Sequence, residues 1–442
     1  MDICVVGLGK LGLPLAVQFA LKGHRVRGAD IKQQTVELIN QGIEPFPGEA
    51  HLDVLLPQVV KSGNLVATTQ TTEAVASSEV VVVVVPLIVD NDANPDFTAM
   101  DAATSAVGRG LKSGTLVSFE TTLPIGTTRN RLAPLLAKQS GLEPGTDFFV
   151  TFSPERVLTG RVFSDLRRYP KLVGGIDSSS ESRGAEFYSS VLDFDERDDL
   201  SKPNGVWEMG SSEAAEFAKL AETTYRDVNI GLANQFAKHA DKIGVDVYRV
   251  IEACNSQPYS HIHQPGIAVG GHCIPVYPRL YLHNDPDATI VRTSREANLS
   301  MPEYAVRRLE EEYGDLKDAK IAVLGVSYRG GVKETAFSGV FAVVHELTVR
   351  GADVRVHDPL YSDVEIERLG FTPLRPEDPA DAVVIQADHD EYRNQSLTWV
   401  SSARVILDGR RVLSSGVAPN NVAYIGFRRG PGGSVHRSEI TG

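Results

Sequence analysis

The sequence predicts an α/β protein with two doubly wound domains that are joined by a long central helix. Three observations support this prediction: strand and helix signals alternate in the first half, a long helical stretch begins near Ser211, and a second α/β unit begins at "KIAVLGVSYRG". Such alternation is typical of a mainly parallel sheet covered by helices. We therefore expect a Rossmann-like domain over residues 1–200, a central helical region over 201–305 and a second Rossmann-like domain over 306–442.

The first half begins with a strand, a helix and a second strand. "DICVVG" is a β-branched run that ends in glycine, residues 13–21 have helical apolar spacing, and "HRVRGAD" is a strand that ends at Asp30. Further strands are expected at 65–68, 80–85, 116–119 and 148–152, with helical stretches between several of them. This order predicts a parallel, doubly wound sheet.

After Ser211 the pattern changes to one long helical stretch. Glu213 and Glu216 lie in its first turn and Gly244 lies near its end, as expected for helix boundaries. In the second α/β unit, "KIAVLGVSYRG" precedes a helix at about 338–350 and the strands "DVRVHDP" and "DAVVIQA". The tail from Phe427 is rich in glycine and polar residues, so we expect it to be frayed.

Composition limits the class of protein and of partner. The chain has 442 residues, which is enough for two or three domains. Apolar residues make up 42% and charged residues 23%, and the formal net charge is -13, which argues against a nucleic acid or an anionic membrane as partner. An anionic substrate would therefore need a local basic pocket.

The sequence carries no recognisable targeting or disulfide signal. "MDICVVGLGKLG" has no basic n-region and its apolar run is broken by glycines, which indicates a first strand and not a signal peptide. The longest apolar run, 80–89, contains Pro86 and is shorter than the roughly 18 residues of a membrane helix. Three cysteines are too few for a disulfide framework. We expect a cytoplasmic protein without a transmembrane segment.

The first chemical signal is a dinucleotide-binding pattern. Gly7-Leu8-Gly9-Lys10-Leu11-Gly12 follows a strand and opens a helix, which is the context that the GxGxxG pattern requires. The glycines permit a tight turn, close approach of a pyrophosphate and close helix packing. Asp30 lies 18 residues beyond Gly12, where a carboxylate can bind ribose hydroxyls and repel the extra phosphate of NADP. We therefore expect NAD, with a glycine-rich turn that binds no ligand as the alternative.

The corresponding turn of the second unit, "VLGVSYRGGVKET", has a different pattern. It lacks GxGxxG but carries several glycines together with the basic residues Arg329 and Lys333. A strand-to-helix turn of this kind can hold a phosphate-bearing ligand. A solvated basic loop explains the same residues equally well.

The stretch "VGGHCIPVYP" places Cys273 in a loop of glycines and prolines. A metal site there would use His261, His263, His272 and Cys273, but the second spaced pair of ligands that zinc sites have is missing, so we expect no metal. Cys4 and Cys254, in apolar contexts, fit packed thiols. A thiol on an exposed loop is instead a good nucleophile. Together with an NAD site, Cys273 suggests oxidation through a thiohemiacetal and a thioester to a carboxylic acid.

Other polar residues allow two interpretations each. Lys219 lies in an Ala- and Leu-rich helical stretch and could stabilise an oxyanion, or it could form a surface salt bridge with Glu216 or Glu222. Glu155 and Thr121 each follow a predicted strand, where ligands of α/β proteins gather, although loop hydrogen bonding explains them as well.

The order of these motifs over nearly the whole chain resembles the UDP-glucose/GDP-mannose 6-dehydrogenase family. "GLGKLGLPLA" is similar to the family's NAD turn, "SPERVLTGR" to its substrate-contacting loop, "AEFAKLAETTYRDVNI" to its central helix, and "VLGVSYRGGVKETAFSG" to its UDP-binding segment. "ETTLPIGTT" and "GIAVGGHCIPVYP" resemble two further loops, the second of which carries the nucleophile. The wording "GGHCIP" is closer to the branch that acts on UDP-N-acetylhexosamines.

The resemblance implies a four-electron oxidation of a C6 alcohol by NAD, with a homodimer formed through the central helix. It implies a nucleophilic role for Cys273, an oxyanion-stabilising role for Lys219, and help from Glu155 and Thr121 in positioning or deprotonating water and substrate. The cofactor-binding residues would be Gly7, Gly9, Lys10, Leu11, Gly12, Asp30, Pro86 and Thr121. The substrate-binding residues would be Glu155, Arg156, Arg161, Lys219, Gly266, Gly270, Arg329 and Lys333.

Two positions depart from the family's pattern. Thr223 stands where the family usually has Asn, and Tyr277 stands where it usually has Asp. Threonine can still donate one hydrogen bond, whereas tyrosine is a poor base near neutral pH. Our hypothesis is that Glu155 carries more of the water activation. Oxidation of UDP-glucose, arrest at the aldehyde, and a non-catalytic nucleotide-sugar-binding protein stay open as alternatives.

Overall fold

The structure is a computed structural model, and it describes residues 1–90, 94–394, 402–413 and 422–427. The chain divides into two compact units, one of residues 1–222 and 279–285 and the other of 223–278 and 286–442. The predicted fraying of the tail concerns residues that lie outside the described ones. Among the described helices, none is long and apolar enough to cross a membrane.

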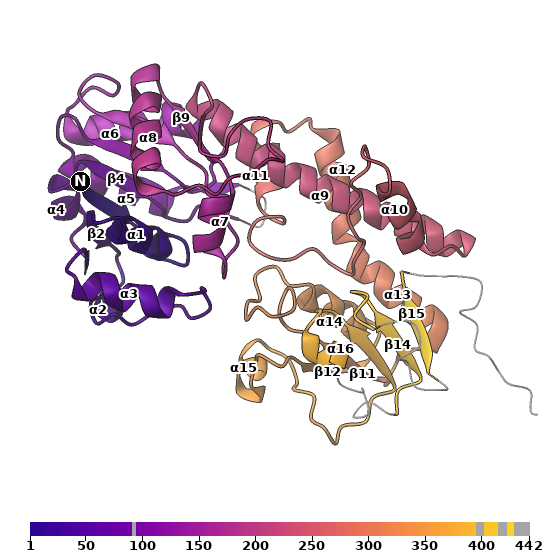
Figure 1. Cartoon of the computed structure of the whole chain (residues 1–442). Helices are drawn as coiled ribbons and strands as arrows, with labels where there is room; N and C mark the ends of the chain where they lie inside the picture. Colours follow the sequence, from indigo (N-terminus) through magenta and orange to yellow (C-terminus); the bar gives the residue numbers. More distant parts are fainter. Residues whose placement is uncertain (91–93, 395–401, 414–421, 428–442) are drawn as a thin grey trace, which may run out of the picture. The chain divides into compact units, whose positions relative to one another are not determined.

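The first unit is built on an eight-stranded sheet in the order β10-β9-β8-β7-β4-β1-β2-β3. Figure 1 draws most of this unit in indigo to magenta. The chain moves from β1 to β2 and β3 on one side and then returns to β4 and β7 on the other, so the order reverses beside β1. The strands are β1 Asp2–Val6, β2 Arg25–Ala29, β3 Leu65–Thr68, β4 Val80–Val83, β7 Leu116–Phe119, β8 Phe149–Phe152, β9 Lys171–Gly175 and β10 Val206–Glu208. A ligand is expected at the carboxyl ends of strands at such a reversal.

Helices cover both faces of this sheet, and its strands bury side chains on both. Ile3 and Val5 of β1 belong to one buried apolar cluster, and Cys4 and Val6 belong to another. The helices are α1 Gly12–Leu21, α2 Gln33–Asn40, α3 Leu52–Lys61, α4 Thr71–Ala76, α5 Thr98–Gly110, α6 Ala133–Ser140, α7 Val162–Arg168 and α8 Ser178–Val191. A hairpin of β5 Ile88–Val89 and β6 Pro95–Asp96 and a short π-helical turn, Thr128–Leu132, complete the unit.

The sheet is parallel, as predicted, except at one pair of strands. β9 runs antiparallel to β8, with Thr151 opposite Gly175 and Phe152 opposite Gly174. Antiparallel strands toward the edge of an otherwise parallel sheet are common. The reversal has a chemical consequence, because it brings Lys171, the first residue of β9, to the end of the sheet where β7 and β8 finish.

The long helical stretch predicted after Ser211 is confirmed as α9, Ser212–Ile243, with Gly244 following it in a left-handed conformation (φ 72°). The two units divide within this helix, between Glu222 and Thr223. The three-region division expected from sequence stays a prediction.

The second unit contains a five-stranded parallel sheet in the order β12-β11-β13-β14-β15. Its strands are β11 Lys320–Leu324, β12 Asp353–His357, β13 Ala382–Ile385, β14 Val405–Asp408 and β15 Ala423–Gly426. The helices assigned wholly or partly to it are the rest of α9, α10 Val247–Asn255, α11 Tyr277–Asn284, α12 Thr289–Leu299, α13 Met301–Tyr313, α14 Val340–Val349, α15 Asp363–Arg368 and α16 Asp390–Asn394. The strand order again reverses beside the first strand, β11.

Candidate active site

The turn between β1 and α1 has the geometry that a dinucleotide requires. Gly7 has φ 93°, and a Cβ there would lie 2.9 Å from the Val84 carbonyl oxygen. A Cβ on Gly12 would lie 1.9 Å from the Gly7 carbonyl oxygen, whereas a Cβ on Gly9 would meet nothing within 4 Å. The first and third glycines therefore permit close packing, and the second leaves open space over the turn, which fits a bound pyrophosphate.

Asp30 is fixed at the end of β2. Its carboxylate accepts the N–H of Leu8 at 2.9 Å and the N–H of Lys32 at 2.9 Å. The side chain is only partly buried, so it can still accept bonds from a ribose. Lys10 and Leu11 lie in the turn between β1 and α1, where Lys10 is exposed and Leu11 is partly buried. Pro86 is exposed and follows β4. Asp30 is thus accessible to a ribose, and the expected NAD contacts of Lys10, Leu11 and Pro86 stay a prediction.

Thr121 and Pro86 follow the neighbouring strands β7 and β4. The Thr121 hydroxyl donates to the Val85 carbonyl at 2.6 Å and so ties the ends of these two strands together. The hydrogen-bonding interpretation of Thr121 is therefore present in the structure. Its expected contact with NAD or substrate stays a prediction.

Glu155 belongs to a buried cluster that the sequence did not reveal. Lys171 Nζ lies 2.7 Å from a Glu120 carboxylate oxygen and 2.9 Å from a Glu155 oxygen, and the Tyr188 hydroxyl donates to Glu120 at 2.7 Å. Ser118 Oγ lies 2.7 Å from the Tyr188 oxygen. Glu155 is 8% exposed and Lys171 4% exposed, so water screens these charges weakly.

The two carboxyl groups of this cluster have different acidities. Burial, together with the nearby Glu155 charge, raises the pKa of Glu120 to about 7, although Lys171 opposes the shift. Burial also opposes ionisation of Glu155, but Lys171 and the Arg156 N–H, which donates at 2.8 Å, hold the pKa of Glu155 below its ordinary value. Glu155 is therefore an anion at neutral pH.

The two arginines predicted to contact substrate are held by carboxylates of the first unit. Arg156 Nε lies 2.8 Å from Glu222, and Arg161 lies 2.8 Å from the fully buried Asp165. Arg156 also donates to the Pro170 carbonyl at 3.4 Å. The ion pairs fix the loop "SPERVLTGR" beside the Glu155 cluster, and substrate contact by either arginine stays a prediction.

Lys219 is buried on α9, with 9% of its surface exposed, so it does not lie on the protein surface. Its expected role at an oxyanion stays a prediction. Glu216 is fully buried and accepts the Thr128 N–H at 2.8 Å and the Thr128 hydroxyl at 2.7 Å, together with the Gly126 N–H. Burial raises the pKa of Glu216 to about 7. Glu216 thereby fixes the helix that carries Lys219 to the turn that follows "ETTLP". Thr223, one turn further along α9, is 7% exposed and belongs to the second unit.

Cys273 is exposed, whereas Cys4 is buried and Cys254 is partly buried. Burial raises the pKa of the Cys4 thiol to about 12, as expected for a packed thiol. The Cys273 carbonyl accepts the Tyr277 N–H at 2.9 Å, and this bond connects the first residue of α11 to the loop that carries the thiol. Among the described residues, no three His, Cys, Asp or Glu side chains are grouped as metal ligands.

The thiol loop is fixed to the turn that follows β11, within the same unit. The Gly271 N–H donates to the Ala336 carbonyl at 2.9 Å. A Cβ on Gly270 would lie 2.6 Å from the Tyr328 Cβ, and one on Gly271 would lie 3.0 Å from the Tyr328 ring. Gly266 is buried and donates its N–H to Asn234 at 3.0 Å. Gly270 and Gly271 therefore lie against the segment that contains Arg329, whereas a Cβ on Gly266 would lie 3.2 Å from the Arg410 side chain.

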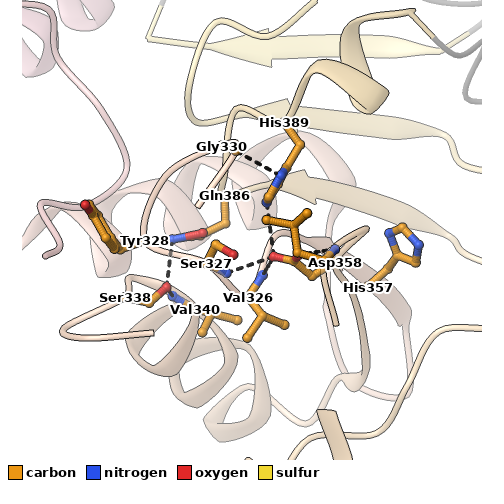
Figure 2. A network of polar contacts seen from close by, with 12 residues as sticks. Val326, Ser327, Tyr328, Gly330, Ser338, Val340, His357, Asp358, Gln386 and His389 are labelled. Carbon is orange, nitrogen blue, oxygen red and sulfur yellow. Dashed lines mark hydrogen bonds and ion pairs between the residues drawn. The ribbon is translucent and has the colours of Figure 1, made fainter. Parts of the chain in front are cut away.

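The turn after β11 presents both expected basic residues to solvent. Arg329 donates to the Tyr328 hydroxyl at 3.1 Å, and Lys333 lies 2.6 Å from Glu365. Beneath them, Asp358 accepts backbone N–H groups and faces His389, as Figure 2 shows. Arg410, which the sequence interpretation missed, donates to the carbonyls of Gln386 at 2.8 Å and Tyr328 at 3.3 Å. The sequence signal for it is the basic pair in "DGRR" directly after β14.

Comparisons with known proteins cover nearly the whole chain. The family's NAD binding domain matches residues 1–192, its central domain 213–299 and its UDP binding domain 322–415. The chain is 35% identical to UDP-N-acetyl-D-mannosamine dehydrogenase of Pyrococcus horikoshii over 97% of this chain and 100% of that protein. A solved structure of UDP-D-ManNAc dehydrogenase from P. horikoshii superposes with a TM-score of 0.85, at 34% identity over 97% and 100% of the two chains.

A second relative is named for a different sugar. NDP-N-acetyl-D-galactosaminuronic acid dehydrogenase of Ralstonia solanacearum is 32% identical over 93% of this chain and 96% of that protein. The glycine turn and Asp30 lie within the match to the NAD binding domain, and the Arg329 turn lies within the match to the UDP binding domain. NAD is thus the cofactor and a UDP-sugar the class of substrate, and the chain belongs to the UDP-glucose/GDP-mannose dehydrogenase family.

Proposed function

We propose that this chain oxidises the C6 hydroxyl of a UDP-N-acetylhexosamine to the uronic acid in a four-electron reaction that passes through Cys273. The observation that carries the proposal is the exposed thiol on a loop fixed to the UDP-binding turn. The relatives are named for an N-acetylmannosamine and an N-acetylgalactosaminuronic acid, and these names support an N-acetylated sugar as substrate. They leave the C2 and C4 configuration open.

The proposed chemistry assigns each step to a group of this chain. When bound, NAD accepts a hydride in each of the two oxidations. The C6 alcohol loses a hydride and gives its hydroxyl proton to solvent to become an aldehyde, and the Cys273 S–H adds across the carbonyl to give a thiohemiacetal. Loss of the second hydride, with the hydroxyl proton again passing to solvent, leaves a thioester. Water then adds to the thioester carbon and gives a proton to Glu155. The carbon–sulfur bond breaks to release the carboxylic acid and the Cys273 thiolate, which takes up the proton that Glu155 received.

Two buried groups of the first unit support the charged stages of this sequence. Lys219 supplies an ammonium that stabilises the oxyanion of each tetrahedral stage, because a preorganised charge acts strongly where water is excluded. Glu155 is kept anionic by Lys171, so it is ready to accept a proton from water. Thr121 and Thr223 are proposed to position water and substrate by hydrogen bonds, and Tyr277 to order the thiol loop in place of the usual Asp.

We also propose a homodimer formed through α9. The part of this helix in the second unit carries large apolar side chains that are exposed and separated by seven, four and seven residues: Tyr225 (58%), Leu232 (45%), Phe236 (38%) and Ile243 (59%). This spacing places them along one helix face. An exposed apolar stripe of this length is typical of a protein interface. In this proposal residues 1–200 bind NAD, residues 201–305 carry dimerisation and catalysis, and residues 306–442 bind the UDP-sugar.

The deciding experiment counts NADH per sugar consumed when the protein is incubated with NAD and a panel of UDP-sugars. Two NADH with a uronic acid as product support the proposal, and one indicates arrest at the aldehyde. None across the panel indicates a nucleotide-sugar-binding protein, and a preference for UDP-glucose would move the substrate to the other branch.

A matched pair of variants tests the nucleophile. Cys273→Ser should abolish acid formation and leave NAD affinity unchanged, because the serine hydroxyl is a far weaker nucleophile at neutral pH. Cys254→Ser, a partly buried thiol of the same unit, is the control and should keep acid formation. Acid formation by Cys273→Ser at the wild-type rate would contradict the proposed mechanism.

A further inference from the structure

The two sheets place an aspartate at the same structural position. Asp30 follows β2 and Asp358 follows β12, the second strand of each α/β unit. In the first unit the Asp30 carboxylate accepts the N–H of Leu8, the residue after Gly7. In the second unit Asp358 Oδ2 accepts the N–H groups of Val326 and Ser327, the residues after Gly325, each at 2.8 Å. Each carboxylate therefore holds the turn that follows the first strand of its sheet.

The two carboxylates differ in what covers them. Asp30 is partly exposed, which leaves it accessible to a ribose. Asp358 is 1% exposed, and the fully buried His389 lies against it with Nε2 3.1 Å from Oδ2 (Figure 2). The other Asp358 oxygen accepts the Leu360 N–H at 2.9 Å. His389 thus closes the position from which a nucleotide ribose would reach this carboxylate.

The hydrogen bonds of His389 assign its tautomer. The Gly331 N–H donates to Nδ1 at 3.3 Å, so Nδ1 is the acceptor and Nε2 carries the proton that is donated to Asp358. Although burial favours the neutral acid, the bonds from His389 and Ser327 hold the pKa of Asp358 below its ordinary value. In the first unit Asp30 accepts the N–H of Leu8, the counterpart of Val326. In the second unit Asp358 accepts in addition the N–H of Ser327, the counterpart of Gly9, and so occupies a group that a phosphate could otherwise use.

His389 and its neighbour Asp388 hold the far end of the turn. The Gly330 N–H donates to Asp388 Oδ1 at 2.9 Å, and a Cβ on Gly330 would lie 2.2 Å from the Asp388 carbonyl oxygen. Residues 326 and 327 are thus fixed by Asp358, and residues 330 and 331 by the neighbours Asp388 and His389. Tyr328 and Arg329 lie between these two fixed points.

We propose that His389 is a positioning residue for UDP: with Asp358 it fixes the 326–331 turn in its binding conformation and excludes a second dinucleotide from this unit. The inference rests on the assignment of this unit as the UDP-binding one and deepens it. A turn that is ordered before the ligand arrives binds more tightly, because less conformational entropy is lost on binding. His389 need not touch the ligand to act in this way.

The test compares His389→Ala with His389→Gln by calorimetric titration with UDP and, separately, with NAD. The alanine variant should weaken UDP binding about tenfold and raise KM for the sugar nucleotide, with kcat and NAD affinity within about twofold of wild type. Glutamine can donate to Asp358 and accept from Gly331, so His389→Gln should restore most of the affinity. His345→Ala, an exposed histidine on α14, is the control and should bind UDP as wild type does.

A measurement on the wild type keeps the inference testable if the alanine variant does not fold. The amides of Val326, Ser327 and Gly331 should be protected from hydrogen exchange to the same extent with and without UDP. Protection that appears only with UDP would overturn the inference, as would UDP affinity in folded His389→Ala within about twofold of wild type, or two NAD bound per wild-type chain. A wild type that binds UDP but forms no NADH would contradict the proposed oxidation alone. A wild type that binds no UDP would contradict both the proposed oxidation and the role of His389.

Discussion

At the residue scale, the ionisation of Glu155 depends on one buried ammonium that two carboxylates share. Lys171 contacts Glu120 and Glu155 and is itself buried. Removing the ammonium would leave two carboxyl groups close together in a weakly screened site, where one of them becomes protonated. The ionisation of Glu155 at neutral pH is therefore a property of three side chains and not of one.

Lys171→Met should shift the acid limb of uronic acid release to higher pH. Lys171 lowers the pKa of Glu155, so its loss raises that pKa and leaves Glu155 protonated at pH values where the wild type is ionised. The measurement is the pH profile of acid release under saturating NAD and sugar nucleotide. Lys171→Arg keeps the charge and is the control. An acid limb at the same pH in Lys171→Met would show that Glu155 does not limit hydrolysis.

The contribution of Glu216 to the free energy of unfolding should fall as pH rises, whereas the pKa of the nearby Glu213 is shifted in the opposite direction. Its pKa is about 7 in the folded chain against 4.5 ordinarily, so the native state binds the extra proton and stability from this group falls as pH rises from about 4.5 to 7. Glu216→Gln removes this titration. Relative to wild type it should gain up to about 3 kcal/mol between pH 5 and pH 8.

Urea unfolding of both proteins at pH 5 and pH 8 measures this difference. Glu213→Gln is the control, because Arg129 holds the pKa of Glu213 below its ordinary value, so stability from Glu213 is lost as pH falls. That loss falls below about pH 4.5, so the difference between the Glu213 variant and wild type should stay nearly constant between pH 5 and pH 8. An equal gain by both variants between these pH values would contradict the assignment for Glu216.

The sequence predicted those site residues whose signal is local. The glycine turn, Asp30 and the loop of Cys273 each follow from neighbours within a few positions along the chain. Lys171 could not be predicted, because its contact with Glu155 depends on the antiparallel direction of β9, and "KLVGG" carries no signal for strand direction. His389 was missed for a similar reason: it meets Asp358 across 31 residues of chain.

At the scale of elements, α9 has buried polar side chains in its first turns and exposed apolar side chains in its later turns. Its first turns bury Glu216 and Lys219 in the first unit, and its later turns expose the apolar stripe of Tyr225, Leu232, Phe236 and Ile243. Helix length and both ends were predictable from apolar spacing and Gly244. The stripe was not, because whether an apolar side chain is covered depends on the elements that pack beside the helix.

Leu232→Glu should dissociate the proposed homodimer. A charge placed in an apolar interface is desolvated without a partner, which costs several kcal/mol across two copies. Sedimentation velocity at micromolar concentration measures the shift from dimer to monomer. Val349→Glu, at an exposed apolar position outside the stripe, is the control and should sediment as wild type does. A wild type that is monomeric, or a dimer that Leu232→Glu leaves intact, would contradict the role of the stripe.

At the scale of the whole molecule, both α/β units have a turn of the same kind after their first strand, but the surroundings of the two turns differ. Each unit has its own buried core and its own strand reversal, and each fixes its first turn through an aspartate. The open space over Gly9 suits a pyrophosphate, whereas in the second unit Asp358 and His389 accept backbone N–H groups of the corresponding turn. The alternation of strands and helices predicted both sheets. It could not predict this difference, because the covering histidine comes from the distant end of β13.

NAD and UDP should therefore protect separate parts of the chain. With each ligand at 100 times its Kd, the unit that binds it should gain about 2.7 kcal/mol. Peptide-resolved hydrogen exchange under native conditions should show NAD slowing exchange around Gly9 and Asp30, and UDP slowing it around 266–271. Since the two sites draw on different backbone amides, both ligands together should give the sum of the two patterns. NAD protection at Val326 and Ser327 would contradict this division, because Asp358 already occupies those amides.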